Sequence, residues 1–259
     1  DVKVPYVWNL LDGLRDAGIS VDAELADVYT QWSDANQPAE GEWGSWPHSF
    51  PEMPINSALI TAAAGRTDTA VVVIGRAAGE ARESELTAGS FYLTEQERAL
   101  LDQVTDAFAR TIVVLDVGNV IDLSWIADYD DHLGAVLLAW QGGMEGARAV
   151  AAVLSGEIAP SGKLTDTIAW SYSDYPSSAH FGGTDFNIYA EDIFVGYRYF
   201  ETFAKDRVQY PFGFGLTYTW FAVAVDAVVA DSAAVTITVT VTNSGEVAGR
   251  EVVQAYLRA

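Results

Sequence analysis

The sequence of 259 residues contains no cysteine, which excludes disulfides and thiolate metal sites and leaves the redox compartment open. Basic residues are scarce, because 14 Lys and Arg stand against 36 Asp and Glu, for a formal charge of −22 at pH 7. Without an excess of cations to neutralise phosphates, neither nucleic acid nor an anionic membrane surface is an expected partner. No apolar run approaches the roughly 20 residues of a membrane span. The acidic excess is best explained by solubility.

The length and hydrophobicity of the chain predict a folded protein. Half of the residues are hydrophobic, so a sizeable core is available, and 259 residues suit one large domain or one domain with a small appendage. The chain begins at Asp1 rather than Met and has no signal-like segment. We therefore expect a recombinant piece, a processed product or a fragment of a longer protein.

The spacing of apolar residues predicts helices first and then a regular alternation of strands and helices. Asp22 is a candidate N-cap, and Thr94 with Glu97 forms a candidate capping box. Helices are expected over residues 5–17, after Asp22, and over 57–64, 95–109 and 145–155; β-branched runs predict buried strands over 69–74, 111–117 and 133–139. This order predicts an α/β fold, in which helices cover both faces of a mostly parallel sheet.

The C-terminal third of the chain has a different character. Residues 170–220 are rich in aromatics and glycine with little periodicity, which predicts an ordered surface segment rather than a flexible linker. Valines and Ile237 then alternate with threonine over 235–241, a turn is expected at 243–245, and a further apolar stretch follows at 252–256. We expect three antiparallel strands here, the start of a truncated β-sandwich, since a complete one has about seven. This also favours a fragment.

Three strand ends are expected to meet at one edge of the parallel sheet, where α/β proteins bind ligands. They are the segments 75–83, 118–119 and 141–143. Glu80 lies on the first of them between Gly79 and Ala81, which are too small to bury its carboxylate. A carboxylate placed there can act as a general acid/base, or it can be one of many solvated acidic residues. Glu83 is a second, less favoured candidate for the same role.

Other chemistry has weaker support. The loop after residue 74 lacks both the G-x-G-x-x-G spacing and the Gly-Lys-Ser/Thr ending of phosphate-binding loops. His48, His132 and His180 are isolated and show no metal-ligand spacing, and no G-x-S-x-G nucleophile elbow occurs. Asp116 could be functional or could stabilise a turn, and we prefer the turn. No cofactor or metal is therefore expected. The aromatic residues could stack on sugars, although hydrophobic packing is the favoured role.

Several motifs together resemble glycoside hydrolase family 3, the β-glucosidase family. They follow the family's order over about residues 70–259: VVIGRAAGE (72–80), QGGMEG (141–146), PSGKL (160–164), FVGYRYF (194–200), PFGFGLTY (211–218), VTNSG (241–245) and VVQAY (252–256). The resemblance covers the family's α/β-sandwich domain, which we assign to residues 1–218, and the start of its fibronectin-III-like domain, which we assign to residues 219–259.

The resemblance implies retaining hydrolysis of a β-glucoside or oligosaccharide by two carboxylates. In the family the nucleophile is an Asp on a separate (β/α)8 barrel, and this chain contains no barrel pattern and no Ser-Asp-Trp nucleophile motif. Glu80 matches the acid/base Glu of members with a Gly-Glu-Gly loop. The resemblance therefore implies the acid/base-bearing domain of a β-glucosidase, inactive without a barrel domain of the same parent protein.

The chain departs from the family pattern at two positions. Ala81 replaces the Gly after the Glu, and Ser84 stands where an Arg usually follows. The first change is expected to stiffen the loop, and the second to weaken sugar contacts or a local ion pair. These departures motivate a second hypothesis, that of a non-catalytic carbohydrate-binding or interaction module with the same fold. The sugar, the compartment and the oligomeric state do not follow from the sequence.

Overall fold

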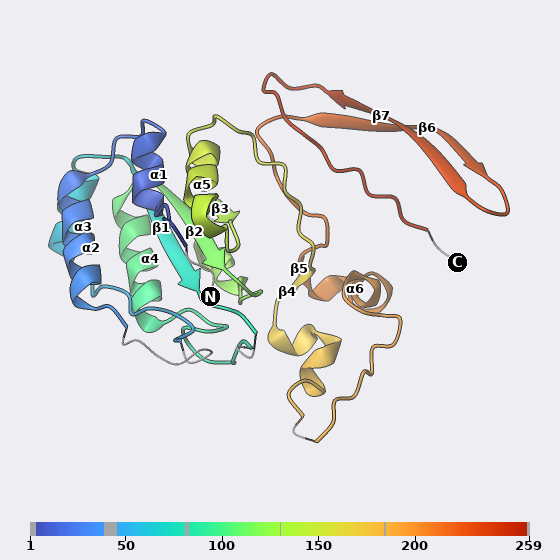
Figure 1. The fold of residues 1–259 in the computed structure, drawn as a ribbon, viewed down its shortest axis with the longest axis horizontal. Helices are drawn as coiled ribbons and strands as arrows, with labels where there is room; N and C mark the ends of the chain where they lie inside the picture. Colours follow the sequence, from blue (N-terminus) through green and yellow to red (C-terminus); the bar gives the residue numbers. More distant parts are fainter. Residues whose placement is uncertain (1–3, 39–45, 81–82, 130, 184, 258–259) are drawn as a thin grey trace. The chain divides into compact units, whose positions relative to one another are not determined.

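The computed structural model describes residues 4–38, 46–80, 83–129, 131–183 and 185–257. The chain divides into two compact units, Asp1–Ala151 and Ala152–Ala259, which are described separately below (Figure 1). No helix in the described ranges has both the length and the apolar character that crossing a bilayer requires. The predicted division into domains 1–218 and 219–259 stays a prediction.

The first unit is built on a three-stranded parallel sheet in the order β1-β2-β3. Its strands are β1 (Thr69–Arg76), β2 (Arg110–Val117) and β3 (Leu133–Leu138). The α/β fold class is confirmed. Strand β1 runs two residues beyond the predicted end, because Gly75 and Arg76 continue the parallel register opposite Asp116 and Val117.

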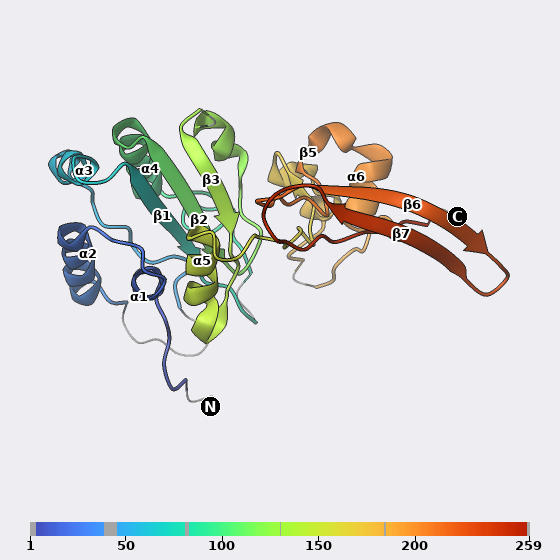
Figure 2. The ribbon, with the colours of Figure 1, turned by 90° about the horizontal axis from the view of Figure 1, so that it is seen from above.

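Helices lie on both faces of this sheet. Figure 2 shows α4 on one face and α1 and α5 on the other. The helices of the unit are α1 (Leu10–Asp16), α2 (Ala23–Ala35), α3 (Ser57–Ala64), α4 (Glu95–Ala107) and most of α5 (Gly146–Leu154), whose last three residues belong to the second unit. It also has 3-10 turns at η1 (Ser124–Tyr129) and η2 (Gly143–Glu145). Helix α1 begins later than predicted, because the Asn9 side chain caps it by accepting from the Asp12 amide.

Helix α4 covers the more deeply buried face of the sheet. Val113 and Leu115 of β2 are fully buried, as is Leu101 of α4. Each such side chain contributes roughly 1.5–3 kcal/mol through burial. The predicted capping box is present, since Thr94 accepts from the Glu97 amide and the Glu97 side chain accepts from the Thr94 amide. Two backbone amides at the start of α4 are thereby satisfied.

The second unit begins with short elements around an aromatic core. Strands β4 (Ile168–Ala169) and β5 (Val208–Tyr210) pair antiparallel. Phe200 of helix α6 (Tyr197–Phe203) is fully buried, and Tyr175 meets it edge-on at 5.7 Å between ring centroids. The remaining turns are η3 (Tyr172–Asp174), η4 (Pro176–Ala179) and η5 (Lys205–Arg207). The segment is ordered as expected, but α6 was not predicted from its sequence.

The unit continues into a two-stranded antiparallel hairpin of β6 (Phe221–Ala230) and β7 (Val235–Asn243). The expectation of a third strand over 252–256 was wrong, since described residues 250–257 form no strand. Their side chains instead contact earlier parts of the unit: Glu251 pairs with Lys163 at 3.1 Å, and the Tyr256 ring lies 5.6 Å from that of Tyr197. A strand needs backbone pairing, which this segment lacks.

Candidate functional site

The three predicted strand ends do meet at one edge of the sheet. Asn119, after β2, donates to the Ser84 hydroxyl at 3.1 Å, and Gln141, after β3, donates to the Arg76 carbonyl at 3.5 Å. Gly118 is the closest point, because a Cβ built there would lie 2.4 Å from the Ala78 Cβ and 2.9 Å from the Gln141 side chain. The loop after β1 is therefore packed directly against the ends of β2 and β3.

Glu80 lies on this loop, four residues beyond the end of β1, with an exposed side chain. Within the described ranges, no hydrogen bond or ion pair holds its carboxylate. The backbone before it is held in place. The Ala77 amide donates to the His48 carbonyl at 2.7 Å, and Gly79 packs against Trp46, so that a Cβ built at Gly79 would lie 3.1 Å from the nearest atom of the Trp46 ring. Glu80 thus combines an anchored main chain with a carboxylate that can approach a ligand.

The other sequence-predicted residues of the loop have different environments. Glu83 is also exposed, three residues further along. Ser84 is partly buried and accepts the Asn119 hydrogen bond, so its hydroxyl joins the loop to the end of β2. The prediction that Ala81 stiffens the loop concerns a residue outside the described ranges.

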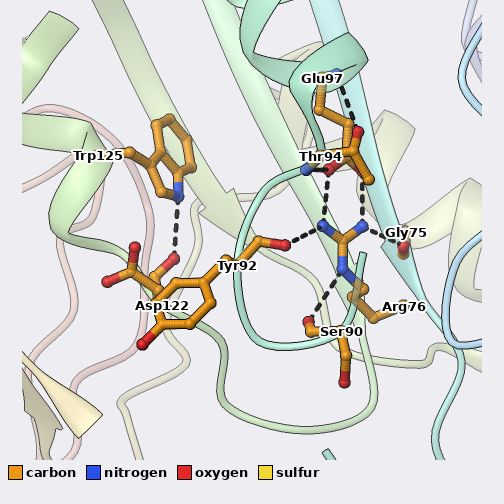
Figure 3. A network of polar contacts seen from close by, with 8 residues as sticks. All are labelled: Gly75, Arg76, Ser90, Tyr92, Thr94, Glu97, Asp122 and Trp125. Carbon is orange, nitrogen blue, oxygen red and sulfur yellow. Dashed lines mark hydrogen bonds and ion pairs between the residues drawn. The ribbon is translucent and has the colours of Figure 1, made fainter. Parts of the chain in front are cut away.

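Arg76, the last residue of β1, is the main polar anchor of the site, and only 5% of it is exposed. It forms a bidentate ion pair with Glu97 of α4, at 2.6 and 2.7 Å (Figure 3). Its remaining donors reach the carbonyls of Ser90, Tyr92 and Gly75 at 3.1, 3.3 and 2.7 Å. The fork geometry of a guanidinium suits this arrangement, which a lysine could not reproduce.

The sequence did not indicate this role for Arg76, which lay in the loop that lacks a phosphate-binding pattern and in the motif over residues 72–80. The capping box identified Glu97, but nothing local indicates a partner 21 residues away. The unusual backbone of Trp140, two residues after the end of β3, was not predicted either; its φ is 56°. This left-handed conformation is rare for a bulky residue and tends to occur at functional sites.

Two of the weaker candidates, His48 and Asp116, lie in the first unit. His48 lies beside the loop, with its Nε2 atom 3.3 Å from a Glu85 carboxylate oxygen. In the described part of the chain, no group of three or more His, Asp or Glu side chains is arranged to hold a metal ion. Asp116 lies inside β2, where burial raises the pKa of its carboxyl. The described residues show no hydrogen bond from it to the turn that follows at Gly118, so its turn-stabilising role stays a prediction.

Comparison with known proteins places these features in a family. The family model "Glycosyl hydrolase family 3 C-terminal domain" matches residues 1–218. A β-glucosidase of Ruminococcus albus is 46% identical over 259 residues, which is all of this chain and 27% of the relative. An exo-α-(1→6)-L-arabinopyranosidase of Bifidobacterium longum is 38% identical over 69% of this chain and 23% of its own length.

The fold is shared with solved structures of the same kind. A β-glucosidase from Paenibacillus barengoltzii superposes with a TM-score of 0.92 at 47% identity, over 96% of this chain and 28% of that one. The chain thus spans about a quarter of the length of the first relatives it matches. The family model, the identities and the shared fold agree, and the chain belongs to glycoside hydrolase family 3, whose C-terminal α/β domain it contains.

Proposed function

We propose that this chain is the acid/base-bearing domain of a retaining family 3 β-glycosidase that acts on β-glucosides, with Glu80 as the acid/base. One observation carries the proposal: Glu80 presents an exposed carboxylate from an anchored main chain at the ligand-binding edge of a parallel sheet. The names of the relatives support the substrate class, since the R. albus and P. barengoltzii proteins are β-glucosidases. The arabinopyranosidase relative shows that similarity to this domain does not by itself fix the sugar.

In this proposal the chain supplies half of the chemistry. An Asp on a (β/α)8 barrel of the parent protein attacks the anomeric carbon and forms a glycosyl-enzyme. Glu80 donates its proton to the leaving oxygen during that step and then takes a proton from the water that hydrolyses the intermediate. The exposed carboxylate fits both steps, because it must exchange protons with substrate and with water. Without the barrel, the chain is expected to be inactive.

Glu80→Ala in the complete parent enzyme tests the assignment. We expect kcat/KM for cellobiose, whose leaving group needs protonation, to fall by about 10²–10⁴-fold. Hydrolysis of 2,4-dinitrophenyl glucoside, whose leaving group needs no proton, should form the glycosyl-enzyme at a nearly normal rate. Azide, which can attack the intermediate without a base, should then partly restore turnover. Glu83→Ala is the matched control, and unchanged activity of Glu80→Ala on cellobiose would refute the proposal.

A second candidate function is a non-catalytic carbohydrate-binding module with the same fold. It is favoured by Ser84, whose hydroxyl is occupied by Asn119 and which replaces an arginine expected from the family pattern. Calorimetric titration of the isolated chain with glucose and with cellobiose separates the two functions. A measurable intrinsic affinity supports the binding module. Absent binding, together with activity on adding the barrel domain, supports the glycosidase.

A further inference from the structure

Arg76 closes the loop that carries Glu80. It stands at the loop's first position, at the end of β1, while the carbonyls of Ser90 and Tyr92 stand at the loop's other end. Its guanidinium reaches both carbonyls, so the two ends of the segment are joined through one side chain. Glu80 lies between them in the sequence. Loss of the Arg76 guanidinium would therefore remove one contact shared by both ends of the loop, while the backbone contacts of Ala77 and the hydrogen bond of Ser84 remain.

The same guanidinium fixes the closed loop to the rest of the unit. Glu97, in the first turn of α4, accepts from both terminal nitrogens of Arg76. Its Oε2 atom also accepts from the Thr94 amide at 2.8 Å, so the carboxylate is itself held by the capping box. The side chains of Arg76 and Glu97 are only 3% and 8% exposed. Solvent therefore screens this ion pair little.

All five N–H donors of Arg76 are used in these contacts. Such a fully satisfied network holds a single geometry. Figure 3 shows the guanidinium surrounded by its acceptors. Among the residues that the structure describes, no hydrogen bond links this network to the exposed Glu80 side chain, so it can position the loop without forming part of the reacting groups.

We propose that Arg76 is a positioning residue for proton transfer. Through its hydrogen bonds to the Ser90 and Tyr92 carbonyls and its ion pair with Glu97, it sets the position of the Glu80 carboxylate relative to the glycosidic oxygen. This inference rests on the proposed function. Proton transfer requires the acid within about 3 Å of its target, and a displacement of about 1 Å can cost roughly 100-fold in rate. Loss of these Arg76 contacts should therefore impair protonation of the leaving oxygen more than sugar binding.

The experiment measures this selectivity in the complete parent enzyme. Arg76→Lys keeps a cation beside Glu97 but loses the planar guanidinium that binds Glu97 and the carbonyls at the same time. We expect kcat/KM for cellobiose to fall by about 10–100-fold, with at most about a 3-fold change in the rate of glycosyl-enzyme formation from 2,4-dinitrophenyl glucoside. Active sites are counted by trapping with a 2-deoxy-2-fluoro-glucoside, so that partial misfolding, which lowers both activities equally, is corrected. Arg110→Lys, in the same sheet but 63% exposed, is the matched control and should alter neither rate.

A milder variant keeps the test decisive if Arg76→Lys folds poorly. Ser90→Ala removes the hydroxyl that accepts from the Glu85 amide at 2.8 Å, loosening the loop while Arg76 remains. It should shift the ratio of the two rates in the same direction by about 3–10-fold. If Glu80→Ala shows the leaving-group effect and both variants keep the normal ratio, the positioning role is overturned and the proposed function stands. If Glu80→Ala itself shows no such effect, both proposals fail.

Discussion

Gly118 is the residue at which the candidate site is most tightly packed. A Cβ there would lie 2.4 Å from the Cβ of Ala78, on the loop that carries Glu80. The Gln141 amide, at 2.9 Å, could rotate away, but the Ala78 Cβ cannot move without its backbone. The requirement for glycine at this position is therefore steric, and it is imposed by a neighbouring loop rather than by a special backbone angle.

Gly118→Ala is expected to destabilise the chain by about 1–3 kcal/mol, the usual range for overpacking. The measurement is the free energy of unfolding of the isolated chain in urea. Gly146→Ala is the matched control, because Gly146 has helical backbone angles and open space around its Cβ position. It should be neutral or should stabilise by up to about 1 kcal/mol. Equal effects of the two substitutions would contradict the close packing of the loop.

Helix α2 is attached at its start and near its middle. Asp22 accepts from the Leu25 amide and pairs with Arg66 at 2.6 Å. Tyr29 donates to the carboxylate of Glu52 at 3.1 Å, and the Met53 amide donates to the same oxygen. Burial raises the pKa of Glu52, and the two hydrogen bonds only partly oppose this. The attachment of α2 at Tyr29 should therefore depend on pH.

Because the pKa of Glu52 is higher in the folded chain than its usual 4.5, the folded state holds the proton more tightly. Its ionisation then lowers stability as the pH rises from about 4.5 through the raised pKa. Glu52→Gln keeps an acceptor for both donors and cannot ionise. We expect it to raise the free energy of unfolding at pH 7 by on the order of 1 kcal/mol, with the gain vanishing near pH 4.

Urea unfolding between pH 4 and pH 8 checks this expectation. Asp27→Asn, an acid-to-amide change at an exposed position of α2, is the control and should stay within about 0.5 kcal/mol at every pH. A stability gain from Glu52→Gln that does not change with pH, or a loss at pH 7, would show that desolvation of the carboxylate is not the governing effect.

Across the whole molecule, stability is expected to be uneven. Strand β2 lies between two partner strands and is buried over most of its length. Strands β6 and β7 form a two-stranded sheet, and Val225 and Val229 are each 64% exposed. An isolated two-stranded hairpin is only marginally stable in water. The two sheets should therefore open with very different free energies.

Hydrogen exchange of the isolated chain measures this difference. Amides of residues 113–115 in β2 should exchange at least about 10³-fold more slowly than the paired amides of β6 and β7, since core strands open only near global unfolding. The amides of α4, which packs on the parallel sheet, serve as an internal reference and should follow β2. Comparable protection of the hairpin and of β2 would contradict the expected order.

Much of the fold was predictable because its signals are local. The Asp22 cap and the capping box of Thr94 and Glu97 lie within three residues of the groups they bind. The parallel strands are visible in the sequence as runs of β-branched residues. The convergence of three strand ends followed from parallel pairing alone. The family motifs, which lie in order along the chain, placed Glu80 above Glu83 as the candidate carboxylate, and that ranking stays a prediction.

The sequence by itself thus determined the helices and parallel strands of the first unit and the family, since each depends on periodicity, on caps or on motifs in contiguous residues. Only the tertiary structure decided that Arg76 pairs with Glu97, that Gly118 lies against Ala78, and that residues 250–257 pack against Lys163 and Tyr197 instead of adding a strand. These contacts join residues 21 to 88 positions apart, as in Arg76 with Glu97 and Lys163 with Glu251. They depend on packing that no local pattern encodes.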